Sequence, residues 1–584
     1  MLRGSFVFRI CFGWLLCLCL CFGGVSPVLA TLVEDDAIYG YLHRLADPDA
    51  DARKEVLSAL ASTGDSRVEA FFEAYRIGSV YLLDGKIVLC EETIEDDDLN
   101  EFAPLVDPLT RQPLQKGAEP LIVPLEELTP VSPTRSERRL ITSATYLLRL
   151  YSPDTEMRLS GAKKCGDPPG VPEARDRLEE LAMADPVQKV KHVAKESLLL
   201  LKLEETHAAQ RWDEHREISR SLGEMRSMRA LPRFQNLLSG LDEAEKEGQE
   251  IDATTRQVYK VASVAIERHQ GFVDRIGGIF QGISLGSVLI IMALGLAITF
   301  GLMGVINMAH GEFLMIGAYA TYEMQLLFMR LIDKGHLPES AYGWYYVAAF
   351  PTAFLSAAFF GIIVEYLVVR HLYRMPLESL LATWGVGLVM IQMVRLRYGD
   401  NIGVNAPEWA RGGVEVMQDV ILPNSRCFII ALCAFCVILI YSLMRYTTLG
   451  LQMRATMQNR DIAKSLGVNT DRVDRYTFAF GTGIAGIAGY AWTLIGGVTP
   501  DMGQKNFIVD SFLVVVVGGV GEIVGVICSG LGIGIVTKFL EPIYIGDFVI
   551  GAIWAKVLLL VVVVIFIQFK PAGLFAPKGR LADV

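Results

Sequence analysis

Long apolar runs in the second half of the chain constrain its fold more than any other feature. Residues 271–584 carry 21 Lys and Arg against 20 Asp and Glu, and most of these charges lie between apolar stretches. Several stretches reach the roughly 20 residues that a helix needs to cross a bilayer. Lipid cannot satisfy backbone hydrogen-bonding groups, so the runs predict an α-helical membrane domain over residues 276–570 with about eight or nine spans. The candidate spans are 279–303, 313–330, 345–369, 380–395, 427–443, 476–495, 511–524, 526–540 and 548–569.

The first half has a different composition. Residues 31–270 carry 31 Lys and Arg against 45 Asp and Glu, within a chain of net charge −11. Neither half has the basic excess that nucleic-acid binding requires, so nucleic acid is not an expected partner. The charge pattern indicates an acidic, water-exposed domain joined to a membrane domain.

The N-terminus resembles an export signal. Arg3 and Arg9 precede or border the apolar run 10–22, and small residues follow up to Ala30. This pattern predicts a signal peptide at residues 1–30, cleaved after Ala30. The alternative is an uncleaved anchor, since residues 6–25 could just span a membrane. Either interpretation exports residues 31–270.

The exported domain repeats a helical theme. Asp or Ser next to Pro opens amphipathic segments near residues 47, 152 and 184, and a looser copy lies at 212–238. Paired short helices at periods of roughly 30–45 residues predict a HEAT-like α-solenoid over residues 31–270, and the fold class is therefore mainly α. The rhythm fails between Gly78 and Pro133, where the segments 80–83 and 86–89 around Asp84-Gly85 predict a β-hairpin insert.

This domain shows no pattern of a catalytic or metal site. His192 and Glu196 stand four residues apart, but no third ligand follows at a recognisable spacing, so no metal is expected. Cys90 and Cys165 are either a disulfide, if the compartment is oxidising, or two thiols. We expect a non-enzymatic domain, and its binding partner cannot be named from the sequence.

Basic residues orient the membrane domain. Lys and Arg cluster at 370–374, at 445–475 and in the tail 571–584, which the positive-inside rule places in the cytoplasm. The loops 400–423 and 541–547 are acidic or neutral and are expected outside. Nine crossings from an outside N-terminus end inside, in agreement with the exported domain. Arg395 and Arg397, at an outer helix end, are the main exception.

Two features mark possible points on a path through the membrane. Gly518 and Gly519 lie in the short segments 511–524 and 526–540, which predict a broken hairpin; a tight helical hairpin is the alternative. His310 and Glu312 are ionisable residues in or near a span and are functional candidates for that reason. Snorkelling of a helix-end residue is the alternative for most such groups.

The loop 449–475 contains a short helix of its own. Asn459 can cap it, Gly467 suits its left-handed end, and Ile462, Ala463 and Leu466 form a small apolar face beside Arg460 and Lys464. Such a helix can dock into a cytosolic motor, and the alternative is a helix lying on lipid. No G-x-x-x-x-G-K-[ST] phosphate-binding loop occurs, so an ATPase would be another chain.

Three ordered motifs carry a family resemblance. GLAITFGLMGVINMAHGE at 295–312, GVTPDMG at 497–503 with VVVGGVG at 515–521, and KPAGLF at 570–575 resemble the signatures of branched-chain amino acid-type ABC permeases. The resemblance covers about residues 275–582. Within the family, the exported extension, KFLEP at 538–542 and LFAPKGR at 574–580 are most similar to the urea transporter permeases of the B-subunit type.

The resemblance implies a permease subunit of an ATP-driven importer in the inner membrane, with the N-terminal domain in the periplasm. Its expected partners are a second permease, two cytosolic ATPases, a periplasmic substrate-binding protein and the lipid bilayer. ATP and Mg would bind the ATPases, and this chain would bind no cofactor. The segment 459–467 is similar to the coupling helix that receives the ATPase stroke. Path candidates for a neutral solute are Asn307, Thr493, Thr499 and Gln504, besides His310, Glu312, Gly518 and Gly519.

Three readings of function remain. The first is a urea permease, and the second is the same machine carrying branched-chain or other amino acids. The third is a membrane receptor with a periplasmic sensor domain, although only fifteen residues follow Phe569. An intramembrane enzyme would need a buried nucleophile–base pair or paired carboxylates, and neither occurs at a suitable spacing.

Overall fold

The computed structural model describes residues 35–575 apart from 48, 91–92, 96–100, 117–118, 248–251, 374, 546–547, 550 and 572. The predicted signal peptide and the end of the tail lie outside the described residues. Backbone contacts divide the chain into two units, with the boundary between Gln270 and Gly271. Each unit is described by itself.

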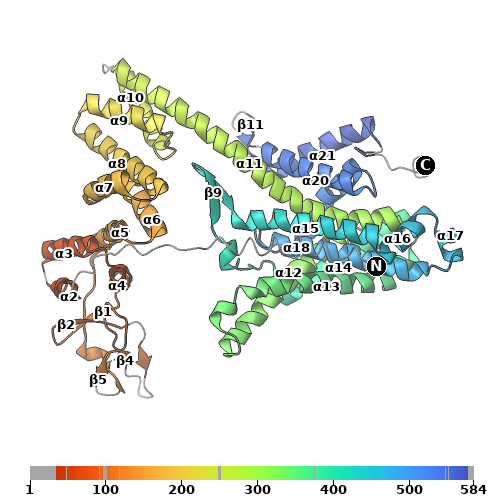
Figure 1. The fold of residues 1–584 in the computed structure, drawn as a ribbon, viewed down its shortest axis with the longest axis horizontal. Helices are drawn as coiled ribbons and strands as arrows, with labels where there is room; N and C mark the ends of the chain where they lie inside the picture. The colour runs from red at the N-terminus through yellow and green to blue at the C-terminus, as the bar shows by residue number, and fades with distance from the viewer. Residues whose placement is uncertain are drawn as a thin grey trace, which may run out of the picture. The chain divides into compact units, whose positions relative to one another are not determined.

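The first unit is mostly helical. Helices α5 to α9 follow one another as a stack, in which α8 contacts α6, α7 and α9 (Figure 1). The predicted helices are present, and the HEAT-like solenoid stays a prediction. The helices are α2 (Asp35–Arg44), α3 (Ala50–Ser62), α4 (Ser66–Ile77), α5 (Arg135–Arg149), α6 (Thr155–Gly166), α7 (Arg175–Ala184), α8 (Gln188–Ala208), α9 (Trp212–Glu224) and α10 (Leu231–Lys246).

Helix starts in this unit carry capping residues. The side chain of Asp154, which follows Ser152-Pro153, accepts a hydrogen bond from the Glu156 backbone N–H at 3.2 Å before α6. Asp185 accepts from the Val187 N–H at 2.8 Å and so shapes the turn before α8, whose N-cap residue Val187 makes no side-chain cap bond. These bonds satisfy backbone donors that a helix start leaves open. The Asp and Pro pattern therefore predicted these helix starts correctly.

The insert between Gly78 and Pro133 is built of short strands. The predicted hairpin is confirmed: β1 (Val80–Leu83) pairs antiparallel with β2 (Lys86–Leu89), and Val80 lies opposite Leu89. Asp84 and Gly85 adopt φ values of 49° and 77°, which a two-residue hairpin turn of this kind requires. The other strands are β3 (Ile94–Glu95), β4 (Glu101–Pro104), β5 (Gln115–Lys116), β6 (Glu119–Pro120), β7 (Ile122–Pro124) and β8 (Thr129–Pro130).

The cysteines of this unit do not form a disulfide. Cys90 and Cys165 are both buried, and no bond joins them. Burial raises the pKa of the Cys165 thiol to about 12, and nearby Arg229 opposes the shift. Of the two alternatives drawn from the sequence, the disulfide is wrong.

A buried histidine links three helices of the first unit. His215 Nδ1 lies 2.9 Å from Thr206 Oγ1, and its Nε2 lies 2.6 Å from the Tyr259 hydroxyl. Burial lowers the pKa of His215 to about 4, and the nearby His207 charge adds to this shift. The folded unit therefore holds this ring neutral at neutral pH.

Acidification should loosen this cluster. Below pH 6.5 the unfolded chain binds a proton on His215 while the folded unit does not, so stability falls as pH drops from 6.5 toward 4. We expect local stability around α9 to fall by about 2 kcal/mol between pH 7 and pH 4.5. Hydrogen exchange of α9 amides in the purified full chain measures this, with His43→Gln, at an exposed histidine, as the control. The assignment fails if His215→Gln keeps the wild-type pH dependence.

The second unit holds the membrane helices. Helix α11 (Ala253–Met303) begins in the first unit and is 51 residues long, so it extends well before the predicted span 279–303. The other helices are α12 (His310–Asp333), α13 (Trp344–Leu367), α14 (Pro376–Tyr398), α15 (Asn424–Tyr446), α16 (Thr448–Gln458), α17 (Arg460–Ser465), α18 (Thr470–Trp492), α19 (Ile508–Gly518), α20 (Ile523–Leu540) and α21 (Gly551–Phe569). Two short strands, β9 (Gly413–Met417) and β10 (Val420–Pro423), pair between α14 and α15, and β11 (Tyr544–Ile545) pairs with β12 (Phe548–Val549).

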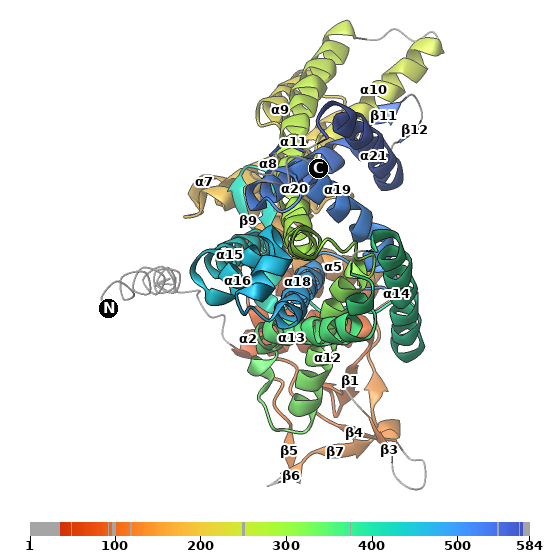
Figure 2. The same cartoon turned by 90° about the vertical axis from the view of Figure 1, so that its right-hand side faces the viewer.

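Six helices among the described residues are long and apolar enough to cross a membrane. They are α11, α13 with its flanking turns, α14, α15, α20 and α21. Helices α12 and α18 coincide with two further predicted spans but are not among the six. They lie side by side with α13 at the centre of the unit (Figure 2). A mainly α-helical membrane permease fits this architecture.

Glycines let the central helices touch at their backbones. A Cβ placed on Gly317 of α12 would lie 2.0 Å from the carbonyl oxygen of Gly486 on α18. A Cβ on Gly489 would lie 1.9 Å from the carbonyl oxygen of Leu314. Small residues also stand at 481, 485 and 489 of α18, and small side chains allow such close approach of helices in lipid.

The predicted break near Gly518 and Gly519 is present, but it lies earlier than the boundary at 524. Helix α19 ends at Gly518, and Gly519 and Gly521 adopt φ values of 102° and 87°, which glycine adopts readily. Helix α20 then starts at Ile523. The backbones meet across the break, because a Cβ on Gly525 would lie 2.0 Å from the Gly518 carbonyl oxygen.

A methyl group at Gly317 should therefore be costly. We expect Gly317→Ala to destabilise the purified full chain by about 1–3 kcal/mol, since the added carbon overlaps the α18 backbone. Gly385→Ala on α14 is the matched control, because a Cβ there meets nothing within 4 Å. Thermal unfolding in detergent measures both variants. Equal unfolding midpoints would contradict the close α12–α18 contact.

Candidate functional site

A buried non-helical loop joins α11 to α12. It runs from residue 304 to residue 309, and Val305, Asn307 and Ala309 in it are buried. The Asn307 side-chain oxygen accepts a hydrogen bond from the Ala309 N–H at 3.1 Å. The Met308 N–H donates to the Thr383 hydroxyl of α14 at 3.0 Å. Irregular backbone that is buried in protein needs partners for its polar groups, and these bonds supply two of them here.

Three buried side chains at this loop keep polar atoms without a partner. We call Asn307, His310 and Glu312 the buried polar cluster. Their exposed fractions are 0%, 0% and 2%. The atoms without a hydrogen-bond partner are Asn307 Nδ2, His310 Nδ1 and Glu312 Oε2. Because such atoms are costly to bury, the cluster is a candidate for binding a polar solute.

Glycines on neighbouring segments make room for the cluster. A Cβ on Gly295 would lie 3.2 Å from the His310 ring, whose Nε2 lies 3.1 Å from the Met292 carbonyl oxygen. A Cβ on Gly387 of α14 would lie 3.1 Å from the Glu312 carboxyl carbon. Two helices therefore border these polar side chains with bare backbone.

The other path candidates are not gathered in one place. The Thr493 hydroxyl donates to the Tyr490 carbonyl of its own helix at 2.7 Å, and Thr499 donates to Asp501 at 3.0 Å. Gln504 is half-buried in a π-helical segment (Gly503–Phe507) that packs against α12. Gly518 and Gly519 form the break between α19 and α20. Asn307, His310 and Glu312 are thus close in sequence at the α11–α12 junction, where His310 borders α11 and Glu312 borders α14, and the other candidates lie at separate positions.

Two residues of the site were not found from the sequence. Thr383 is fully buried and bonds the loop backbone, and a polar residue within an apolar span was the signal available for it. Gly387 faces Glu312 and carries no such signal. Its role appears only when α14 is placed against α12.

The cytoplasmic loop contains the predicted short helix. In α17 the Asn459 side chain caps the first turn by accepting from the Ile462 N–H at 3.0 Å, and Gly467 adopts a φ of 87°. Ile462 and Leu466 are 58% and 79% exposed. Ala463 faces inward at 3% exposure, so only part of the predicted apolar face is available for docking.

A network of charged and aromatic groups ties α17 to other helices. Arg460 lies 2.5 Å from the Asp474 carboxylate of α18, and its guanidinium lies 5.3 Å from the centre of the Tyr373 ring. The Tyr373 hydroxyl donates to Glu365 of α13 at 2.9 Å, and Arg475 lies 3.4 Å from the same carboxylate. The carboxylates of Asp474 and Glu365 are both almost fully buried. The network therefore connects α17 with both α13 and α18.

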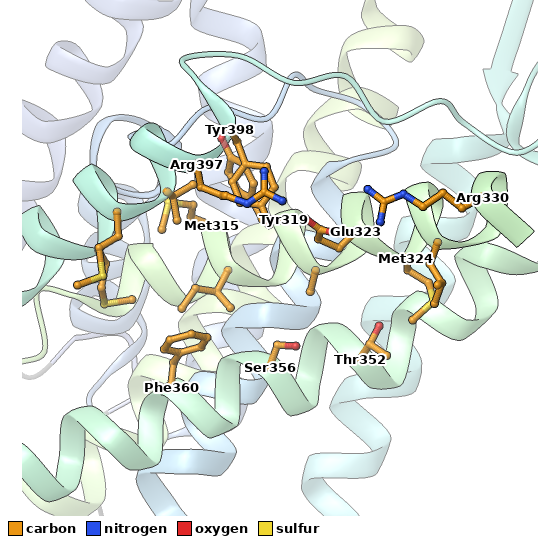
Figure 3. Close-up of a pocket in the computed structure, with 16 residues that line it drawn as sticks. Met315, Tyr319, Glu323, Met324, Arg330, Thr352, Ser356, Phe360, Arg397 and Tyr398 are labelled. Atoms are coloured by element: carbon orange, nitrogen blue, oxygen red, sulfur yellow. Dashed lines mark hydrogen bonds between the residues drawn. The ribbon is translucent and has the colours of Figure 1, made fainter.

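A separate cavity of about 570 Å³ lies between α12, α13 and α14 (Figure 3). Met315 and Phe360 lie toward one end of it, and Arg330, Met324 and Thr352 lie toward the other. The Tyr398 hydroxyl donates to the Glu323 carboxylate at 2.5 Å. The Tyr319 hydroxyl, on a side chain that is 4% exposed, has no hydrogen-bond partner.

The described residues offer no group of three or more His, Cys, Asp or Glu side chains that could hold a metal ion. His192 and Glu196, considered for this role, do not belong to such a group. The chemistry that these buried polar groups can supply is hydrogen bonding.

Comparisons with known proteins give this arrangement its context. Residues 278–567 match the family described as branched-chain amino acid transport system / permease component. The chain is 32% identical over 274 residues to the high-affinity branched-chain amino acid transport system permease protein LivH of Escherichia coli K12, covering 44% of this chain and 82% of that protein. It is 25% identical over 301 residues to the corresponding protein BraD of Pseudomonas aeruginosa, covering 50% of this chain and 93% of that protein. No solved structure gives a significant match. The chain therefore belongs to the permease component family of branched-chain amino acid-type ABC transporters, whose members are not enzymes.

Proposed function

We propose that this chain is the permease subunit of an ATP-driven urea importer and forms the translocation path together with a second permease. The observation that carries the choice of solute is the buried polar cluster. None of its three side chains makes a hydrogen bond or ion pair with a lysine or arginine among the described residues. A solute bound there would have no cation to pair with a carboxylate, which favours a neutral polar molecule.

The polar atoms of the cluster match the hydrogen-bonding groups of urea. In the neutral ring, His310 Nε2 donates to the Met292 carbonyl, so Nδ1 is left as an acceptor. Nδ1 and Glu312 Oε2 could each accept from a urea N–H group, on different faces of α12, and Asn307 Nδ2 could donate to the urea carbonyl. The cluster is closed in this conformation, so the solute would reach it after a rearrangement of the helices.

Branched-chain or other amino acids are the second candidate solute. The relatives with assigned cargo are named as branched-chain amino acid permeases, and identity of about a third leaves room for either cargo. Glu312 could pair with the ammonium group of an amino acid. The carboxylate of the amino acid would still lack a cation at the cluster, and for that reason we place urea first.

The assembly follows from the family. We infer a second permease, two cytosolic ATPases carrying ATP and Mg, and a periplasmic substrate-binding protein. The chain would be a multi-pass protein of the inner membrane. Residues 31–270 precede the matched segment, and we propose that they form a periplasmic helical domain that takes part in solute capture or assembly. A receptor function has no supporting observation in the structure.

Uptake of labelled urea separates the two cargoes. We expect binding-protein-dependent uptake at micromolar urea to require this chain and to persist with excess leucine. Asn307→Leu should lower this uptake at least tenfold, because it removes a donor from the closed site. Thr537→Val is the control, since this buried hydroxyl bonds only the Ile533 carbonyl of its own helix. If leucine blocks uptake, or if leucine is transported in place of urea, the transported solute is an amino acid and not urea.

Docking of α17 can be tested independently of the cargo. The double variant Ile462→Asp and Leu466→Asp should abolish co-purification of the ATPase and reduce uptake to background, because it places charge on the two exposed apolar side chains. Val414→Asp with Val416→Asp is the matched control, as these residues of β9 are 56% and 59% exposed in the loop predicted to lie outside. Normal uptake in the α17 variant would remove the coupling assignment.

A further inference from the structure

The side chains that line the cavity between α12, α13 and α14 change in character from one end to the other. On α13, Thr352, Ser356 and Phe360 follow at four-residue spacing and point into it (Figure 3). On α12 the lining changes in the same sense, from Arg330 through Glu323 to Met315. Arg330 and Thr352 therefore lie at one end of the cavity, Met315 and Phe360 lie at the other, and Arg397 of α14 lies on the side of Met315.

The cavity belongs to a surface suited to contact with lipid. Helices α13 and α14 are both candidate spans, and only 33% and 28% of their most apolar windows are buried within the chain. Met393 of the lining is itself 64% exposed. An amphipathic molecule in the bilayer can thus enter from the side, with its apolar part directed into the membrane.

The charged side chains that line the cavity are arranged in an unusual way. Arg330 and Arg397 lie in the last turns of α12 and α14, and both are exposed. Neither forms an ion pair within the described part of the chain, although Arg397 lies 5.1 Å from the Tyr398 ring centre. These helix ends are expected outside, where the positive-inside rule disfavours arginine. Arg395 differs from them, because it pairs with Asp400 at 2.7 Å.

One acidic group lies on the same wall between the two arginines. Glu323 accepts a hydrogen bond from Tyr398 and lies between Arg397 and Arg330 in Figure 3. The wall therefore presents positive, negative and positive charge in sequence. The Tyr319 hydroxyl nearby is buried without a partner, which points to a polar atom of a ligand.

We propose that this cavity binds a phospholipid with an ethanolamine headgroup. Arg397 takes its phosphate, Glu323 takes its ammonium, and an acyl chain follows the methionine-lined end past Phe360. Guanidinium groups suit phosphate, and the carboxylate supplies the opposite charge for the amine. This inference does not depend on the transported solute or on the proposed ATPase coupling.

Lipid selectivity tests the proposal. Purified full chain in detergent is titrated with phosphatidylethanolamine, phosphatidylcholine and phosphatidylglycerol of equal chain length, and retained lipid is counted by native mass spectrometry. We expect ethanolamine lipid to bind about tenfold more tightly than the other two, because its headgroup alone offers Glu323 a positive charge that carries N–H donors. Equal binding of all three lipids by the wild-type chain would overturn the proposal without any variant.

Variants of the lining residues test which side chain binds the ammonium group and which binds the phosphate. Glu323→Gln should remove the preference for ethanolamine lipid over glycerol lipid, whereas Arg397→Gln should weaken all three about equally. Met390→Trp, which fills the apolar end, should weaken all three while leaving headgroup preference intact. Arg445→Gln, in the last turn of α15 and away from the cavity, is the control and should change nothing.

Competition distinguishes the other possible occupants. Displacement of the lipid by inorganic phosphate would mean a free-anion site. Displacement by urea or leucine would mean a solute site, and loss of lipid when the second permease is co-purified would mean that a helix of the partner fills the cavity. Each of these results would replace the lipid as occupant.

Discussion

Backbone contact at glycine holds the central helices of the membrane unit together, and the positions of the polar groups depend on it. Gly317 of α12 and Gly486 of α18 meet with no space for a Cβ, and Gly311 meets Gly503 in the same way. In lipid, apolar side chains gain little by leaving one apolar surrounding for another, so dispersion contacts at short range must supply the stabilisation. Small residues allow the helices to come close enough for these contacts.

This packing explains how the polar, non-helical loop between α11 and α12 is held inside the unit. The start of α12 is fixed by the Gly311–Gly503 contact, and the loop before it is fixed by the hydroxyl of Thr383. Asn307, His310 and Glu312 are therefore held in place by neighbours that carry few polar atoms of their own. Their remaining hydrogen-bonding capacity is left available, which is the property that a solute site requires.

Local sequence patterns predicted most of the elements but few of the tertiary relations. The cap at Asn459, the turn at Asp84-Gly85 and the helix start at Asp154 depend on nearby residues, and all three are present. The α19–α20 break lies earlier than predicted, because hydrophobicity alone does not distinguish the glycines that adopt positive φ from those within a helix. The dispersal of Thr493 and Thr499 away from the cluster follows from bonds within their own segments, which helix spacing does not reveal.

The contribution of Gly387 and the network around Arg460 required the structure for the same reason. Both join helices that are far apart in sequence, and one sequence taken by itself carries no signal for such pairs. Membrane spans themselves were easier to find, since length and apolar composition are local properties.

The bonds of Arg460 have a mechanical consequence. Helix α17 is only six residues long, so it has little rigidity of its own, yet it is fastened to α18 through Asp474 and to α13 through Tyr373 and Glu365. A force applied to its exposed side chains would therefore act on both α13 and α18, which pack against each other. Of these two helices, α18 meets α12 at glycine contacts that leave no space for a Cβ, so a continuous path of contacts runs from α17 to the helix that carries His310 and Glu312.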